Sequence, residues 1–115
     1  MTTTIYGIKN CDTMKKALVW LGNHDIKHVF HDYKKDDVDE RILNQAINAH
    51  GWENVLNKRG TTWRNLPDRL KDTMDNTKAV TIAKQNPSLI KRPLLVHNEK
   101  TYLGFKAETY TEIFG

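Results

Sequence analysis

The order of hydrophobic patterns at the start of the chain constrains its fold more than any other feature of the sequence. Residues 3–8 favour a β-strand, and residues 26–31 read as a second one. Between them, apolar residues recur at three- and four-residue steps, which predicts an amphipathic helix that stops at Gly22-Asn23. The residues of this apolar stripe are Met14, Ala17, Leu18 and Leu21. Strand, helix and strand in this order predict a right-handed βαβ unit with parallel strands.

A block of helical patterns follows in the middle of the chain. Asp36-Asp37 suit the positive end of a helix dipole, so we expect a helix from there to about Gly51. Its apolar stripe consists of Val38, Ile42, Ala46 and Ile47. The rest of the block predicts short helix and loop at 52–65 and further helices at 66–75 and 77–85.

Two apolar runs near the end of the chain, residues 93–97 and 100–105, are separated by Asn98-Glu99 and predict a hairpin. Residues 106–114 predict a terminal helix. The outer segments together predict an α/β fold, with a mixed four-stranded sheet in the order βαβ…ββα and helices on it. The middle block, about residues 37–86, is then a helical insertion. We expect the whole chain of 115 residues to form a single domain.

Charge narrows the choice of ligands. Eighteen Lys and Arg against fourteen Asp and Glu leave a net charge of +4. Because the bases are interleaved with acids, the excess favours anionic small molecules over a nucleic-acid surface. The N-terminus carries no readable secretory signal, and no stretch is apolar enough to span a bilayer. We expect a cytoplasmic monomer with no membrane partner and no direct nucleic-acid partner.

The one cysteine of the chain, Cys11, excludes an internal disulfide and lies in a polar break between the first strand and the first helix. A helix N-terminus stabilises a thiolate, and nearby lysines add positive charge that Asp12 offsets only in part. These lysines are Lys9, Lys15 and Lys16. The neighbours therefore favour a nucleophilic thiolate at neutral pH. The alternative is an inert cysteine packed in the core, a common role for this residue.

A redox cycle that begins at Cys11 needs a second thiol from outside the chain. A dithiol enzyme would carry Cys-x-x-Cys, but Met14 stands where the second sulfur would be, and a thioether cannot resolve a mixed disulfide. The resolving thiol must then belong to glutathione or to another protein.

A second candidate motif, Lys91-Arg92-Pro93, stands immediately before the third predicted strand. In this sheet order the start of that strand faces the cysteine loop. A cis Arg92-Pro93 bond would place a guanidinium, whose rigid fork of donors suits carboxylates and oxyanions, beside Cys11. The alternative is a solvated basic turn followed by a proline that starts the strand.

Three segments in this order, Tyr6–Ala17, Arg59–Arg64 and Ile90–Leu95, resemble the arsenate-reductase-like (ArsC/Spx/YffB) family. The chain is most similar to the YffB branch of small bacterial proteins, and the resemblance runs from residue 4 to the C-terminus. It implies a thioredoxin-like fold with a helical insertion, a nucleophilic Cys11 and a cis-Pro93. It also implies a glutathione-dependent thiol reductase, with glutathione as co-substrate and no bound cofactor.

The predicted site combines this resemblance with the residues themselves. Cys11 is the expected catalytic nucleophile, and Arg92 is expected to orient the anion. Glutathione is expected to contact Lys9, Asn10, Asp12, Thr13, Arg59, Arg64 and Pro93. The segment Arg59–Arg64 is interpreted as a lid whose arginines hold glutathione carboxylates. The alternative is a turn that an aromatic residue anchors on the core.

The resemblance also bears on arsenate. Members that reduce arsenate surround the cysteine with three arginines, of which this chain keeps Arg92. The other two positions fall on Asn57 and Phe105. Each charge-assisted contact contributes roughly 1.5–3 kcal/mol, so the loss of two argues against efficient arsenate reduction.

A non-catalytic function is the alternative. Spx-type relatives are transcription regulators that contact RNA polymerase, and many of them use an N-terminal Cys-x-x-Cys as a redox switch. Met14 removes that switch here, but partner binding without it stays open. A metal centre is not expected, because His28 and His31 point to opposite faces of the predicted strand and no thiolate or carboxylate spacing completes a zinc site.

Overall fold

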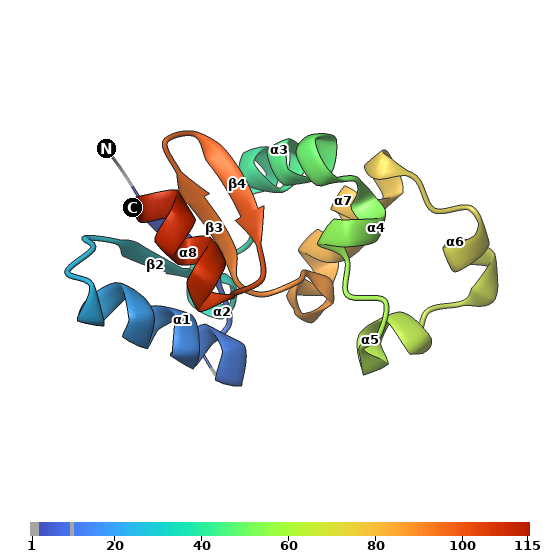
Figure 1. Ribbon diagram of the computed structural model, residues 1–115. Helices are drawn as coiled ribbons and strands as arrows, with labels where there is room; N and C mark the ends of the chain where they lie inside the picture. The colour runs from blue at the N-terminus through green and yellow to red at the C-terminus, as the bar shows by residue number, and fades with distance from the viewer. Residues whose placement is uncertain (1–2, 10) are drawn as a thin grey trace. The chain divides into compact units, whose positions relative to one another are not determined.

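Segments from both ends of the chain build a four-stranded sheet in the structure, a computed structural model that describes residues 3–9 and 11–115. The chain divides into two units, and the segment up to Asp36 forms the first together with Arg92–Gly115 (Figure 1). The elements of this first unit are β1 (Thr3–Gly7), α1 (Asp12–Asn23), β2 (Val29–Asp32), α2 (Tyr33–Asp36), β3 (Leu94–His97), β4 (Lys100–Leu103) and α8 (Ala107–Phe114).

The sheet has the strand order β2-β1-β3-β4. Strand β1 is parallel to β2, as a βαβ unit requires, and antiparallel to β3, which pairs antiparallel with β4. The predicted mixed sheet is therefore confirmed, and the fold is thioredoxin-like. Pairing of Tyr6 with Leu94 sets the register between β1 and β3, so the residues just before β3 lie beside the residues that follow β1.

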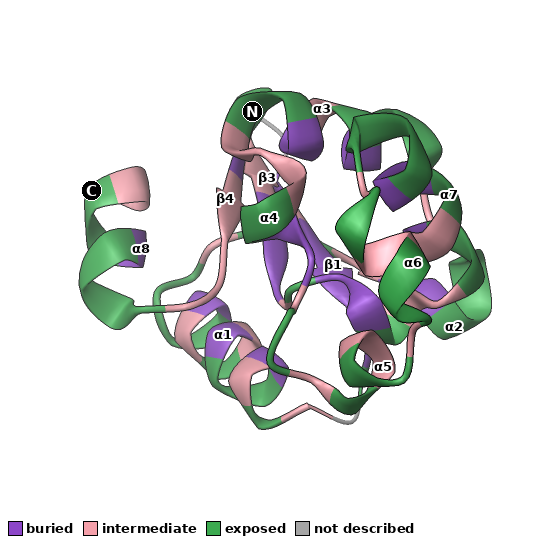
Figure 2. Ribbon diagram, turned by 90° about the vertical axis from the view of Figure 1, so that its right-hand side faces the viewer, coloured by how far each residue is buried: buried purple, intermediate pink, exposed green. Residues whose placement is uncertain are grey.

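The core of the first unit lies between one face of the sheet and the helices α1 and α8. Ile5 of β1 and Leu95 of β3 are register partners, and both are fully buried on this face. They pack against Met14, Ala17 and Leu21 of α1 and Tyr110 of α8. Figure 2 shows β1 buried and α1 buried along one side only. The three- and four-residue spacing of α1 thus selects the face that the helix buries.

The predicted hairpin between β3 and β4 is confirmed. Its two turn residues, Asn98 and Glu99, both have positive φ, at 52° and 68°. A two-residue turn with both φ values positive matches the right-handed twist of the strands it joins, and Asn adopts this conformation more readily than most residues.

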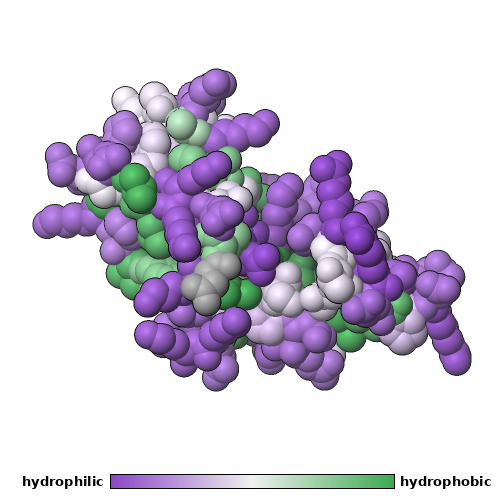
Figure 3. Space-filling model, turned by 90° about the horizontal axis from the view of Figure 1, so that it is seen from below, coloured by the Kyte–Doolittle hydropathy of each residue, from purple (hydrophilic) through white to green (hydrophobic). Residues whose placement is uncertain are grey.

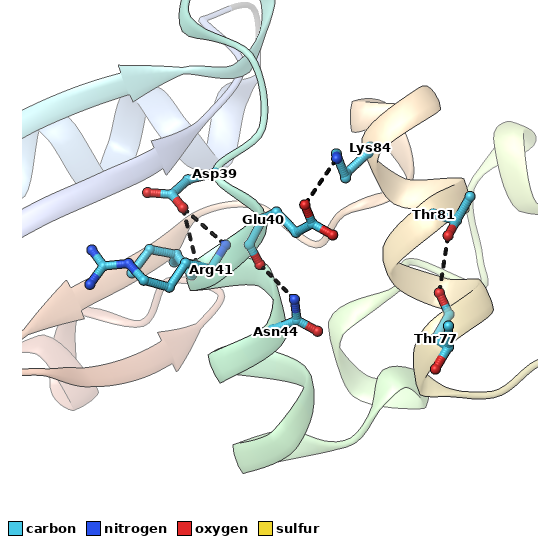
Figure 4. Close-up of polar contacts among 8 residues, drawn as sticks. Asp39, Glu40, Arg41, Asn44, Thr77, Thr81 and Lys84 are labelled. Carbon is cyan, nitrogen blue, oxygen red and sulfur yellow. Dashed lines mark hydrogen bonds and ion pairs between the residues drawn. The ribbon is translucent and has the colours of Figure 1, made fainter.

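The second unit, Asp37–Lys91, contains the helical block. Its elements are α3 (Glu40–His50), α4 (Trp52–Val55), α5 (Thr61–Arg64), α6 (Asp68–Asp72), α7 (Asn76–Gln85) and the 3-10 turn η1 (Pro87–Leu89). Helices α3 and α7 contact each other through buried aliphatic and alanine residues. The Lys84 ammonium also lies 3.1 Å from a carboxylate oxygen of Glu40 (Figure 4). An isolated antiparallel bridge between Leu56 and Ile90 joins the two ends of the block.

The predicted start of the helix at Asp36-Asp37 is wrong. Residues Tyr33–Asp36 form the separate short helix α2, and Asp37 has a φ of 60°, which breaks the helical path. The N-cap of α3 is Asp39, whose side chain accepts hydrogen bonds from the backbone N–H groups of Arg41 and Ile42 (Figure 4). Asp36, Asp37 and Asp39 would each suit the positive end of a helix dipole. The course of the backbone therefore determines which of them is the N-cap of α3.

The predicted stop of α1 at Gly22-Asn23 is confirmed, because the helix ends at Asn23 with its C-cap at His24, and the positive φ that follows falls on Asp25. Two other predicted boundaries need correction. Strand β2 begins at Val29, not at residue 26, because Ile26 donates its N–H to Leu21 at the end of α1. Helix α6 is limited to Asp68–Asp72, whereas a helix over 66–75 was predicted.

No helix in the described part of the chain is long and apolar enough to cross a membrane.

Candidate active site

Cys11 lies where the loop after β1 turns into helix α1. Its backbone is extended, with φ −136° and ψ 127°, and it is the N-cap residue of α1. The carbonyl of Cys11 accepts the first helical hydrogen bond, from the N–H of Lys15 at 3.0 Å. The thiol is half-buried and forms no disulfide. It therefore lies at the positive end of the twelve-residue helix α1, as the sequence predicts.

Opposing effects act on the pKa of the Cys11 thiol. Burial raises this pKa, but the backbone N–H groups of Met14 and Thr13 and the guanidinium of Arg92 lower it, and the lowering effects prevail. The side chain of Cys11 makes no capping hydrogen bond of regular geometry. The N–H groups therefore act on the sulfur mainly as nearby dipoles, and the net result is a thiolate formed more readily than on an ordinary cysteine.

Arg92 and Pro93 approach the cysteine loop from β3. The Arg92–Pro93 peptide bond is cis, as the resemblance implied. Pro93 is buried, whereas Arg92 is half-buried and interacts electrostatically with the Cys11 sulfur. The antiparallel register of β1 and β3 explains this placement, because it sets the residue before each strand beside the residue after the other.

The other residues of the first unit that are predicted to contact glutathione differ in how far they are exposed. Lys9 and Asp12 are exposed, and Thr13 is half-buried on the first turn of α1. Asn10 lies outside the described residues. The backbone of Pro93 has less to offer than predicted, because proline has no N–H and its carbonyl already accepts a hydrogen bond from Gly104 at 2.9 Å. One lone pair of that carbonyl is left for a ligand.

Arg59 and Arg64, the two arginines of the predicted lid, belong to the second unit. The guanidinium of Arg64, the last residue of α5, donates to the Arg59 carbonyl at 3.0 Å and so ties the turn before the helix to the helix end. Arg59 is exposed and lines a pocket of about 370 Å³ together with two other cationic residues, Lys58 and Lys91, and one acid, Glu53. Lys58 forms an ion pair with Glu53, at 3.7 Å. The roles of Arg59 and Arg64 toward glutathione stay predictions.

The two positions that replace arginines have structural roles. Asn57 accepts a hydrogen bond from the Arg59 N–H through its side-chain oxygen, and its own N–H donates to Leu89 at 2.7 Å. The Phe105 ring meets Tyr110 edge-on, with ring centroids 4.7 Å apart. Both side chains are uncharged, so neither position supplies a cation for an oxyanion.

Sequence reasoning missed the part that Gly7 plays in shaping the cysteine loop. A Cβ at Gly7 would lie 2.8 Å from the terminal carbon of Met14 and would also overlap its sulfur. Met14 is fully buried in the core. The absence of a side chain at position 7 therefore lets α1 pack closely on the end of β1. A glycine that ends a strand just before the cysteine was the available signal.

The fold and the thiol together define a class of protein: a thioredoxin-like domain with one activated cysteine at a helix N-terminus and a cis-proline beside it. The model of the ArsC family matches residues 6–113, and the chain belongs to this family. A protein of uncharacterised function from Haemophilus influenzae is 48% identical over 111 residues, which cover 96% of this chain and 97% of that protein.

Two solved structures extend the comparison. A YffB protein is 43% identical with a TM-score of 0.94, over 99% of this chain and 100% of the other. An arsenate reductase (ArsC) related protein from Brucella melitensis is 45% identical with a TM-score of 0.77, over 99% and 95% of the two chains. A more distant relative is the global transcriptional regulator Spx of Streptococcus mutans, 24% identical over 91% of this chain and 77% of that protein.

Proposed function

We propose that this protein is a glutathione-dependent thiol reductase that works through Cys11 alone. The observation that carries the proposal is a thiol whose pKa is lowered by the helix N-terminus and by Arg92, in a chain with no second cysteine. An activated thiol without a partner thiol in the same chain suits a cycle that ends with an external thiol.

The cycle has two exchange steps. The Cys11 thiolate attacks the glutathione sulfur of a mixed disulfide between the substrate and glutathione, that sulfur–sulfur bond breaks, and the electron pair leaves on the substrate thiolate. The resulting disulfide between Cys11 and glutathione is then attacked by a second glutathione thiolate. Oxidised glutathione is released, and the Cys11 thiolate is regenerated. The substrate is thus reduced by two electrons at the expense of glutathione.

Each residue around the thiol has a role in this cycle. Arg92 holds an anionic group of the incoming ligand and stabilises each thiolate that forms at the site. Lys9 adds an exposed positive charge, and the first turn of α1 directs N–H dipoles at the sulfur. We propose that Arg59, in its basic pocket, receives a glutathione carboxylate. Asn57 and Phe105 provide no cation, which favours a disulfide over arsenate as the substrate.

The test uses wild-type protein and Cys11→Ser. After incubation with oxidised glutathione, we expect wild-type protein to gain the mass of one glutathione on Cys11 and the variant to gain none. Turnover of a small glutathione mixed disulfide, coupled to glutathione reductase and NADPH, should fall to the uncatalysed rate in the variant. Retained turnover in Cys11→Ser, or an unreactive wild-type thiol, would rule out the proposal.

The likeness to Spx supports a second candidate, a module that binds RNA polymerase without catalysis. It predicts retention of RNA polymerase on the immobilised protein and equal retention by Cys11→Ser. Retention together with an absence of glutathione turnover would favour this candidate over the reductase.

A further inference from the structure

A shallow groove runs along the outer side of α1. It has a volume of about 350 Å³ and is lined by Lys15, Lys16, Val19, Trp20, Asn23 and Phe105. All of these residues belong to the first unit. Figure 3 views the molecule from below, the side on which α1 lies in Figure 1, and shows hydrophobic surface between hydrophilic side chains. The predicted reductase chemistry makes no use of this groove.

The floor of the groove is apolar and held in place by a buried ring. Val19, in the middle of α1, lines the groove and is 60% exposed. Trp20 and Phe105 each meet Tyr110 nearly perpendicularly, with ring centroids 5.4 and 4.7 Å apart. Tyr110 is 1% exposed. The aromatic part of the groove is therefore formed before any ligand binds.

The rim of the groove is positively charged. Lys15 and Lys16 are exposed, and neither takes part in an ion pair found within residues 3–9 and 11–115. The acid nearest to them along α1 is Asp12, one turn before, which offsets one of the two charges. An apolar floor with a basic rim complements a segment that presents an apolar side chain between carboxylates.

The groove begins one helical turn from the thiol, because the N–H of Lys15 donates to the carbonyl of Cys11. We propose that it docks the polypeptide that flanks the reacting cysteine of a protein substrate, an acidic segment with a large aliphatic or aromatic side chain. This inference rests on the proposed reductase function and names its substrate class as S-glutathionylated proteins. Glutathione itself has no large apolar side chain to fill the groove.

The reaction of such a substrate is balanced. The Cys11 thiolate attacks the glutathione sulfur of the mixed disulfide, and the protein thiolate leaves with the electron pair and then takes a proton from water. Free glutathione next attacks the Cys11 adduct and releases oxidised glutathione. The groove holds the leaving protein segment, not glutathione, so it governs which mixed disulfides are reduced.

The first test measures binding without chemistry, with Cys11→Ser and short synthetic peptides that carry a glutathionylated cysteine. One peptide has a leucine flanked by glutamates, and its partner has lysines in place of the glutamates. We expect the acidic peptide to bind about tenfold more tightly at low salt and to shift the NMR signals of Val19 and the Trp20 indole. Equal binding of the two peptides, or shifts elsewhere, overturns the proposal.

Matched variants locate the contact. Lys16→Glu and Val19→Asp should each weaken binding of the acidic peptide about three- to tenfold, since each removes one favourable contact and adds a repulsive charge. Lys27→Glu and Val29→Asp are the controls, because both residues are exposed in the same unit but do not line the groove, and they should bind as Cys11→Ser does. Equal losses in all four variants overturn the proposal.

The remaining outcomes separate this inference from the reductase function. If wild-type protein turns over a small mixed disulfide but the acidic peptide does not bind, the docking proposal fails and the reductase stands. If the peptide binds in the groove but Cys11 forms no adduct, the reductase fails and the groove stands as a binding surface only. Self-association that Val19→Asp abolishes would assign the groove to a second copy of the chain and overturn the proposal.

Discussion

At the scale of single residues, the lowered pKa of the Cys11 thiol results from one cost and two gains for the thiolate. Partial burial disfavours the thiolate, whereas the first-turn N–H groups of α1 and the Arg92 charge favour it. Arg92 belongs to a distant part of the chain, so the gain from its charge depends on the register between β1 and β3. The Arg92 contribution can therefore be removed without changing α1.

We predict that Arg92→Gln raises the pKa of the Cys11 thiol. Removal of the guanidinium withdraws a favourable charge from the thiolate, so the pH midpoint of iodoacetamide alkylation should move upward. The alkylation rate at pH 7 should fall severalfold. Lys27→Gln removes an exposed charge from the same unit and should leave the midpoint in place. An unchanged midpoint in Arg92→Gln would show that Arg92 does not act on the sulfur.

The same shift links the thiol to stability. Because the pKa of Cys11 is lower in the folded than in the unfolded chain, thiolate formation adds to folding stability, fully so above the unfolded pKa. This contribution is lost as the pH falls through the folded pKa. The free energy of unfolding of wild-type protein, minus that of Cys11→Ser, should accordingly increase as the pH rises from the folded to the unfolded pKa of Cys11. Urea unfolding at several pH values measures this difference.

The packing of Gly7 against Met14 leaves no room for a side chain at position 7. We predict that Gly7→Ala destabilises the protein by about 1–3 kcal/mol, because the new methyl group overlaps the buried Met14 side chain. Urea unfolding measures the loss. The cost should be smaller in a Met14→Ala background, which removes the overlapping atoms. Gly22→Ala is the control, since a Cβ there meets nothing within 4 Å, and it should stabilise helix α1 by up to about 1 kcal/mol.

At the scale of elements, the beginning of α3 shows how a cap is chosen among neighbouring acids. Asp39 closes two hydrogen bonds to backbone N–H groups, at 3.1 and 3.3 Å. We predict that Asp39→Ala lowers the free energy of unfolding by about 1 kcal/mol, the usual value for an N-cap. Asp36→Ala, an exposed acid three residues earlier, should change it by a few tenths at most. Equal effects in urea unfolding would contradict the assigned cap.

At the scale of the whole molecule, the helical unit is inserted into the sequence of the sheet unit. The sheet unit is built from the first and last segments of the chain, and the helical unit, Asp37–Lys91, is contiguous. The core cluster of the sheet unit consists of residues from β1, α1, β3 and α8, all within that unit. The candidate active site lies in the sheet unit, so Cys11 and Arg92 come together only when the two ends of the chain pair through β1 and β3.

Much of this arrangement was predictable, because hydrophobic period is a local property. The spacing of Met14, Ala17 and Leu21 predicts both the helix and its buried side, and two apolar runs separated by Asn98-Glu99 predict the hairpin. The residues at which the elements begin and end were harder to predict from the sequence. The start of β2 at Val29 depends on its pairing with Thr4, a contact between segments that the local pattern does not contain.

The sequence by itself determined that this protein has one thiol, that the thiol stands at a strand–helix junction, and that any redox cycle must take its second thiol from elsewhere. These conclusions follow from counts and local periods. Only the tertiary structure decided that Arg92 acts on that thiol, that Met14 is a core residue packed on Gly7, and that Phe105 and Trp20 form one apolar groove. Such contacts join residues distant in sequence, and the pairing of strands and the packing of buried rings determine them.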